Sequence, residues 1–309
     1  MRKLFKYILN MYLLMFCITS SMYVSAQNDI QISYFMNNEL AFNPSFAGNN
    51  DGIQASVLAR KQWMGFDKAP ETQTIHADYK SKIGGIGLYI LNDGLGSEWS
   101  THAKLLYAYR ITLAEHTHLA AGIGGGLYNK QLNASEFVYQ NPALDPAGIY
   151  TTENTIHPTL DVGIHISHKN LIAGLSSTHI TSALHKGSIF KFPRHYYGYA
   201  QYEHTVSNNI TIVPTLFIKN SGYISQVEGN CNIYFKNKYW VGASYRYHES
   251  AVFLAGIILQ EKIRIGYAYD YSIGTLNNHS KGNHEIIASY TINPNKSNKT
   301  YYQSTRLFN

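Results

Sequence analysis

Apolar and polar side chains alternate along most of this chain, and the alternation is clearest in residues 262–271. Every second residue of this segment is Ile or Tyr, and the residues between them are charged or small. Because successive side chains of a strand point to opposite faces, the segment predicts a strand with one apolar, aromatic face. A polar loop and a second alternating segment, 285–292, complete a predicted β-hairpin. Tyrosine on the apolar face suits a surface that meets lipid headgroups at its edges.

The same alternation, with turn residues between the segments, predicts fourteen strands. They cover residues 52–63, 71–80, 83–91, 98–111, 117–130, 156–168, 171–180, 194–206, 210–219, 223–235, 238–248, 251–260, 262–271 and 285–292. An even number of antiparallel strands is typical of a bacterial outer-membrane β-barrel. We expect the last strand to pair with the first, because lipid does not tolerate a free sheet edge.

The connections between these strands alternate in length. Tight turns are expected at 81–82, 169–170, 237 and 261. Long loops are expected at 131–155, 181–193 and 272–282, although two connections on the same side, near 220 and 249, are short. Short periplasmic turns and longer outer loops are the usual polarity of such barrels. A soluble β-sandwich, which the composition also allows, gives no reason for this segregation.

The composition agrees with a barrel. Mean hydropathy is −0.22 and only 14% of residues are charged, while Tyr and Gly number 26 and 24. A barrel strand needs only every second residue to be apolar, so low overall hydropathy is expected. After the signal, the longest apolar run is about nine residues, 251–259, which is too short to predict a transmembrane helix.

Residues 1–26 have the pattern of a secretory signal peptide. Arg2, Lys3 and Lys6 precede a mainly apolar run, and small residues come before Gln27. The alternative, a single transmembrane anchor, would need a longer apolar run. Export leaves Cys231 as the one cysteine, so no intrachain disulfide is expected.

The mature chain is expected to begin with an irregular periplasmic lead-in, residues 27–50. Asn43-Pro44 and Gly48 indicate turns in this segment rather than a strand. These turns give either a simple entry to the first strand or a docking surface.

Two further features modify the strand prediction. Gly122, Gly124 and Gly126 share one face of the fifth strand, where small inward residues let a strand bend around a barrel. Pro214 lies inside the ninth strand and predicts a bulge or a boundary shift of one or two residues.

Candidate chemistry is sparse. The 14 histidines raise the possibility of a metal site, but His116, His118, His165 and His168 are joined by no Cys, Asp or Glu at a recognised ligand spacing. Pairs of acidic residues occur in predicted turns and loops, where no sequence feature would position them for general acid–base catalysis. The sequence therefore predicts no catalytic residue, no metal site, no cofactor and no enzymatic activity. The formal net charge of +6 falls to +3 without the signal, which is too small to argue for a nucleic-acid partner.

Parity places several charged side chains on the inner face of the barrel. The cationic ones are Arg60, Lys104, Arg110 and Arg264. Charged groups at this depth need water or a partner, and we expect a network with Asp78 and Asp270 rather than a transport path. Trp63 falls near the outer end of the first strand, where an aromatic girdle belongs.

A series of short motifs resembles the PorP/SprF family of type IX secretion outer-membrane proteins. The residues that carry the resemblance are Asn43, Pro44, Gly48, Arg60, Gln62, Trp63, Gly65, Pro70, Gln73, Thr74, Arg264, Gly266, Tyr267, Asp270, His284 and Glu285. Each motif alone is weak, but their order and separations are specific and span nearly the whole mature chain.

The resemblance implies an integral outer-membrane barrel, as in gliding or adhesin-secreting bacteria, that supports secretion or surface attachment of a partner with a C-terminal targeting domain. It also implies contact with type IX secretion and peptidoglycan-associated periplasmic components, and it brings no catalytic residues. We expect a periplasmic tail, 293–309, whose last residues Arg306, Leu307 and Phe308 contact such components. The alternative is a passive channel or small-molecule transporter.

Overall fold

A computed structural model describes residues 29–137, 151–184, 190, 192–222, 224–273 and 280–292 of the chain. The expected signal peptide, residues 1–26, lies outside these residues. So does the expected tail with Arg306, Leu307 and Phe308.

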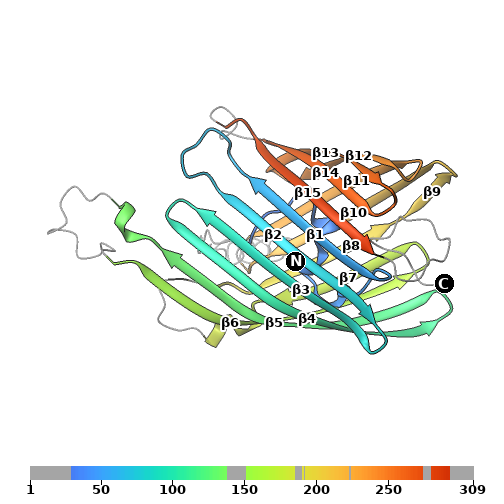
Figure 1. Cartoon of the computed structure of the whole chain (residues 1–309), viewed down its shortest axis with the longest axis horizontal. Coiled ribbons are helices and arrows are strands. Elements are labelled where there is room, and N and C mark those ends of the chain that lie inside the picture. The colour runs from blue at the N-terminus through green and yellow to red at the C-terminus, as the bar shows by residue number, and fades with distance from the viewer. Residues whose placement is uncertain are drawn as a thin grey trace, which may run out of the picture.

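The described residues form a closed antiparallel β-barrel (Figure 1). Its strands are β1 (Ile53–Lys61), β2 (Glu71–Ser81), β3 (Gly84–Leu95), β4 (Glu98–Ala114), β5 (Thr117–Leu132), β6 (Glu153–His168), β7 (Leu171–Thr178), β8 (His195–Tyr202), β9 (His204–Ser207), β10 (Ile210–Asn220), β11 (Ser225–Phe235), β12 (Tyr239–Arg246), β13 (Ser250–Leu259), β14 (Ile263–Ser272) and β15 (Asn283–Ile292). Because β8 and β9 both pair with β10 and follow one another, they act as one interrupted strand. The barrel therefore has fourteen strands in its described part, as the sequence predicts.

The barrel closes where the expected first and last strands meet. β15 pairs with β1 from Ile53↔Ile292 to Lys61↔His284, so neither strand keeps a free edge. Every strand of the ring has two hydrogen-bonded neighbours, because β10 also pairs with β11. No helix among the described residues is long and apolar enough to cross a membrane.

The two ends of the barrel differ in their connections, as Figure 1 shows. One end has tight turns of two or three residues, at 82–83, 115–116, 169–170, 208–209, 236–238 and 260–262. The other end carries the longer connections, including 62–70, 133–152, 179–194 and 273–282. We call these the short-turn end and the long-loop end. All turns at the short-turn end are tight, as the sequence predicts, whereas the long-loop end also has short connections at 96–97, 221–224 and 247–249.

The strands have an apolar outer face and a largely polar inner face. Leu105 is 67% exposed, while the next residue, Leu106, is 2% exposed. Thr72, Thr74 and His76 of β2 are all buried on the inner face. This alternation matches a barrel with lipid outside and polar groups inside.

Pro214 does not interrupt its own strand. β10 runs unbroken from Ile210 to Asn220, one residue beyond the expected end, and its register shift with β9 lies between Ile210 and Thr211 rather than at the proline. The ladder between β10 and the β8–β9 strand is missing at Val213 and Pro214, since Thr215 pairs with Gln201 and the next pair is Ile212 with His204. Proline has no N–H to donate, so the ladder is lost at the neighbouring strand instead.

The lead-in is irregular, as expected, but it lies inside the barrel and not beside it in the periplasm. Residues 32–40 and 42–49 are all buried. Its short 3-10 helices are η1 (Phe35–Asn37), η2 (Glu39–Ala41) and η3 (Pro44–Phe46). Their aromatic side chains pack against aromatic residues of the inner face: Phe35 stacks on Phe217 with ring centroids 4.8 Å apart. Burial of these side chains draws the segment into the lumen. We call residues 29–50 the plug.

Candidate functional site

The plug runs through the lumen from the long-loop end to the short-turn end. At its start, the Asp29 N–H donates to Nε2 of His195, the first residue of β8. At its other end, the Gly48 N–H donates to Oδ2 of Asp78, near the turn that follows β2. The chain then leaves the lumen and enters β1 at the short-turn end.

Inward glycines make room for the plug backbone. A Cβ added at Gly122 would lie 2.3 Å from the Ser45 nitrogen, and one at Gly85 would lie 1.8 Å from the Ala47 oxygen. Both distances are too short for a real contact, so a larger residue would displace the plug. Gly122 of the fifth strand thus has a role beyond bending it: with Gly85 of β3 it admits another segment of backbone.

Asn43 and Pro44 place one turn of the plug against β6. The Asn43 Oδ1 accepts the N–H of Ser45 at 3.0 Å, which caps η3, while its Nδ2 donates to the Ile164 carbonyl at 3.2 Å. Ser45 Oγ lies 2.9 Å from Nδ1 of His165, and Phe46 stacks on the same imidazole at 4.4 Å. This part of the plug is therefore fixed on the barrel wall by specific hydrogen bonds and a ring stack.

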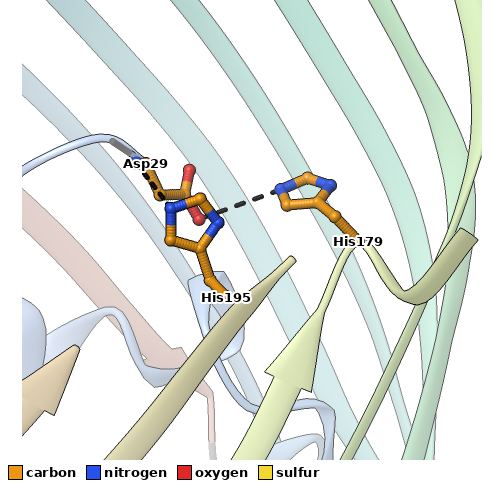
Figure 2. Close-up of side chains that lie close together, drawn as sticks. All are labelled: Asp29, His179 and His195. Atoms are coloured by element: carbon orange, nitrogen blue, oxygen red, sulfur yellow. Dashed lines mark hydrogen bonds and ion pairs between the residues drawn. The ribbon is translucent and has the colours of Figure 1, made fainter. Parts of the chain in front are cut away.

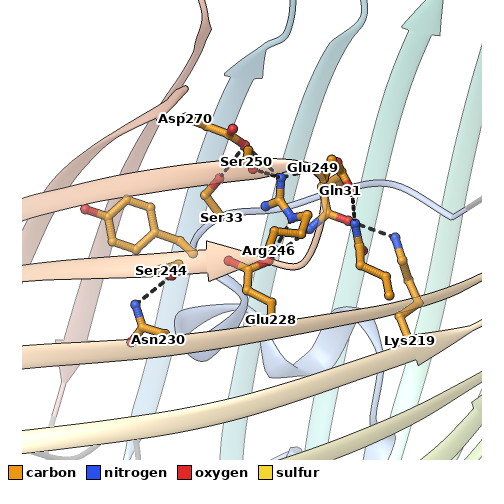
Figure 3. A network of polar contacts seen from close by, with 12 residues as sticks. Gln31, Ser33, Lys219, Glu228, Asn230, Ser244, Arg246, Glu249, Ser250 and Asp270 are labelled. Carbon is orange, nitrogen blue, oxygen red and sulfur yellow. Dashed lines mark hydrogen bonds and ion pairs between the residues drawn. The ribbon is translucent and has the colours of Figure 1, made fainter. Parts of the chain in front are cut away.

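A buried ionic network joins the plug to the wall near the long-loop end. Arg60 contacts Asp270 at 2.9 Å and Glu285 at 3.1 Å, and Arg246 contacts Asp270 and Glu228, each at 2.9 Å. All five side chains are at most 1% exposed. Figure 3 shows Arg246 between Glu228 and Asp270, with Gln31 and Ser33 of the plug beside them. Arg60 and Asp270 pair as the sequence predicts, whereas no sequence pattern pointed to the pair of Arg246 and Glu228.

Glu285 connects this network directly to the plug backbone. Its carboxylate oxygens accept the N–H groups of Ser33 at 2.8 Å and Tyr34 at 2.7 Å. Ser33 Oγ in turn accepts from Arg60 at 2.8 Å. These buried N–H groups have no strand partner, so the carboxylate supplies the acceptor that they need.

Lysines of the inner wall bind plug carbonyl groups. Lys104 Nζ donates to the Ala41 carbonyl at 2.7 Å and pairs with Asp161 at 2.8 Å. Lys219 Nζ donates to the Asp29 carbonyl at 3.0 Å and to Gln31 Oε1 at 2.9 Å. Inward charge on this wall is therefore used largely to hold a segment of the same chain.

Two acidic residues of the plug have shifted pKa values in opposite directions. Burial raises the pKa of Glu39 to about 8, and nearby Asp78 adds to the rise. Burial also acts to raise the pKa of Asp29, but His195, His179 and Lys219 outweigh it and hold that pKa well below its usual range. Glu39 is thus protonated at neutral pH, while Asp29 is a carboxylate.

Two spaces border the described residues, a small one beside the start of the plug and a larger one at the short-turn end. A cavity of about 40 Å³, lined by Asn38, Tyr89 and His102 among others, has room for water but not for a larger solute. A more open cleft of about 750 Å³ lies at the short-turn end. Its lining includes Lys80, Lys82, Arg110, His116 and His118.

Three metal-ligating side chains meet at the long-loop end. Asp29, His179 and His195 each present one ligand atom, and these atoms all lie within 4.8 Å of one another. Figure 2 shows the His195 ring close to Asp29, and a dashed line joins the Asp29 carboxylate to the His179 ring. Sequence reasoning missed this group, because Asp29 is about 150 positions or more from both histidines. The histidine pairs considered from the sequence are not part of it.

The motifs and the fold agree with a single family. The family model described as "Type IX secretion system membrane protein PorP/SprF" matches residues 24–290. The chain belongs to the PorP/SprF family. No curated protein matches the sequence.

Solved structures with low sequence identity share the PorP/SprF chain's architecture. The Ralstonia pickettii toluene transporter TbuX is 9% identical, with a TM-score of 0.51, over 81% of this chain and 92% of that one. The Acinetobacter baumannii outer membrane protein Omp33 is 10% identical, with a TM-score of 0.48, over 79% of this chain and all of that one. The likeness to TbuX shows the fold alone. With the family, it establishes an integral outer-membrane barrel of the type IX secretion system.

The remaining PorP/SprF motif residues lie mostly at the long-loop rim. The Trp63 N–H donates to Asn283 Oδ1 at 2.8 Å with the Trp63 φ at +46°, and the Gln62 N–H donates to the Pro70 carbonyl. Gly65 has a φ of +108°, so the same loop turns there. Tyr267 Oη lies 2.6 Å from Nδ1 of His284 on the outer face.

Four more motif positions lie on the strands below this rim. Thr74 is buried on the inner face and Gln73 faces outward. Arg264 lies 5.5 Å from the Trp240 ring, and Gly266 leaves space for the Tyr34 hydroxyl. The residues that carry the resemblance thus lie in the plug, in the ionic network, at the rim and on the strands below it.

Proposed function

We propose that this chain is a non-enzymatic barrel that supports the secretion or surface attachment of a partner protein with a C-terminal targeting domain. In this proposal the barrel serves as a docking platform and not as a conduit for solutes. The partner is identified only by its chemistry, as a secreted protein delivered by the type IX route.

The observation that carries the proposal is the occupied lumen. The plug is held by hydrogen bonds to wall side chains along its length: Glu285 accepts the Tyr34 N–H, Lys104 donates to the Ala41 carbonyl and Asp78 accepts the Gly48 N–H. Leaving one such buried donor or acceptor without its partner costs about 1–3 kcal/mol, and several of these bonds would have to be lost together to open the lumen. A barrel filled in this way offers its ends for binding.

The two ends suit different partners. We place the long-loop end outside the cell, where the rim that includes 62–70 and 280–282 would meet the secreted protein. The short-turn end would then face the periplasm, and its cleft, lined by Lys80, Lys82 and His116, would meet envelope components of the secretion system. Short periplasmic turns are the usual polarity of such barrels.

Deletion of the gene tests the proposal, followed by analysis of the surface-protein fraction. We expect one or more secreted surface proteins to disappear from the cell surface and to return when the wild-type gene is supplied. An unchanged surface-protein profile would refute the secretion role and leave the barrel intact.

The second candidate function is a passive channel or small-molecule transporter. TbuX, which shares the fold, is a toluene transporter, and barrels of this size can enclose a path. The plug argues against an open path. A steady, substrate-selective current through the purified protein would favour this candidate.

A further inference from the structure

We propose that Asp29, His179 and His195 bind one divalent transition-metal ion, of which Zn²⁺ fits the donor set best. The ion would fasten the start of the plug to the barrel wall at the long-loop end.

The geometry needs only small movements to form the site. The ligand atoms of the three side chains lie within 4.8 Å of one another, and His179 Nε2 is 3.8 Å from Asp29 Oδ2. Bonds to Zn²⁺ of about 2.0–2.2 Å require ligand atoms about 3.4 Å apart in a tetrahedral site. Shifts of about 1 Å in each side chain therefore bring the three atoms onto one ion.

The side chains are already directed inward by their surroundings. His179 has a φ of +54°, and its N–H donates to Asp161 Oδ1 at 3.0 Å, which fixes the backbone just after β7. Asp29 Oδ2 accepts from the Tyr197 hydroxyl at 2.5 Å. His179 and His195 are buried, and Asp29 is half-buried (Figure 2). Such a site is largely shielded from water, with access on the side of the half-buried Asp29.

The donor chemistry selects the class of ion. Two imidazole nitrogens and one carboxylate oxygen suit Zn²⁺, whereas Mg²⁺ and Ca²⁺ prefer oxygen ligands. Three protein ligands leave a fourth position for water or for a group from a partner.

Binding has identifiable costs. His195 Nε2 now accepts the Asp29 N–H at 3.0 Å, and this bond must be given up if the same nitrogen binds the ion. Lys219 Nζ lies 3.0 Å from the Asp29 carbonyl oxygen, so a second cation is repelled. We therefore expect weaker binding than at a closed structural site with four ligands.

The ion would join three segments that are distant in sequence. Asp29 begins the plug, His179 follows β7 and His195 begins β8, so the two histidines lie at the two ends of the β7–β8 connection. A bound ion would hold the plug and this connection together at the rim.

Titration of Zn²⁺ into the full chain tests this site. The protein is purified without a histidine tag in detergent micelles, stripped with EDTA and titrated by calorimetry. We expect one Zn²⁺ per chain, at least tenfold weaker binding in His195→Ala and in Asp29→Asn, and Zn²⁺-dependent slowing of hydrogen exchange at residues 29–33. Unchanged binding in His248→Ala, a variant of an exposed histidine at the same rim, serves as the control.

Two results would overturn the proposal. One is the absence of stoichiometric Zn²⁺ binding by the folded wild-type protein, with folding checked by its mobility on an unheated gel. The other is binding that Asp29→Asn leaves unchanged or that His248→Ala weakens equally, since either places the ion elsewhere. Asp29 lies outside every barrel strand, so its variant decides the matter even if His195→Ala fails to fold.

Discussion

Arg60 and Glu285 are direct register partners across the seam that closes the barrel, and their side chains form a buried ion pair at 3.1 Å. The same Glu285 carboxylate accepts two N–H groups of the plug. Closure of the wall and seating of the plug therefore share one pair of residues.

Arg60→Met should destabilise the folded protein by about 3–5 kcal/mol, because Asp270 and Glu285 then lose a buried cation. Unfolding by guanidinium in detergent micelles measures the change. Lys61→Met is the matched control: Lys61 is the next residue of β1, and its pair with Glu71 is exposed. We expect almost no effect from it, because exposed ion pairs contribute little. Equal effects of the two variants would contradict the role of the network.

Gly122→Ala should displace the plug while the strands persist. Its Cβ would lie 2.3 Å from the Ser45 nitrogen, and such overpacking costs about 1–3 kcal/mol. Gly125→Ala, on the same strand, meets nothing within 4 Å and should be tolerated. Hydrogen exchange at residues 42–48 measures the difference. Unchanged protection of these residues in Gly122→Ala would show that the plug is seated differently.

Glu39 should make the protein less stable as pH rises. Its pKa is about 8 when folded and near the usual 4.5 when unfolded, so between these values the folded state holds a proton that the unfolded state has lost. Its contribution is fully present below about pH 4.5 and falls by about 1.4 kcal/mol per pH unit until pH 8. Denaturant midpoints between pH 5 and 9 should fall more steeply for wild type than for Glu39→Gln. Parallel pH profiles would contradict the buried, protonated Glu39.

Leu105→Lys should weaken folding into lipid vesicles by about 2–4 kcal/mol, because Leu105 faces outward near the middle of β4. Thr101→Lys has the same orientation nearer the strand end, where the cost for a cation is smaller. Folding equilibria in vesicles measure both. A larger penalty for Thr101→Lys would mean that the membrane lies at a different height on the barrel.

The strands were predictable because their signal is local. Alternation along 262–271 fixes which side chains face outward, and the same rule orients Arg60, Lys104 and Asp270 inward. The position of the plug was not predictable in this way. Phe35, Phe42 and Phe46 follow neither the two-residue period of a strand nor the 3.6-residue period of a helix, so no pattern shows which surface they pack against. The feature of the sequence that bears on the plug is the row of inward glycines in β5, which the sequence alone explains equally well by bending of the strand.

The cluster of Asp29, His179 and His195 was hidden for a different reason. A ligand motif is visible in sequence only when its members are close along the chain or recur at known spacings. Here the barrel brings the start of β8 beside the end of β7, and the plug adds the carboxylate. Only the closed fold places the three together.

Conductance in planar lipid bilayers tests the central claim, that the chain's own plug closes its lumen. Full-length protein should stay closed for most of a recording, while a variant that lacks residues 29–50 should carry a steady current. A steady current through the full-length protein, equal to that of the deletion variant, would contradict the account.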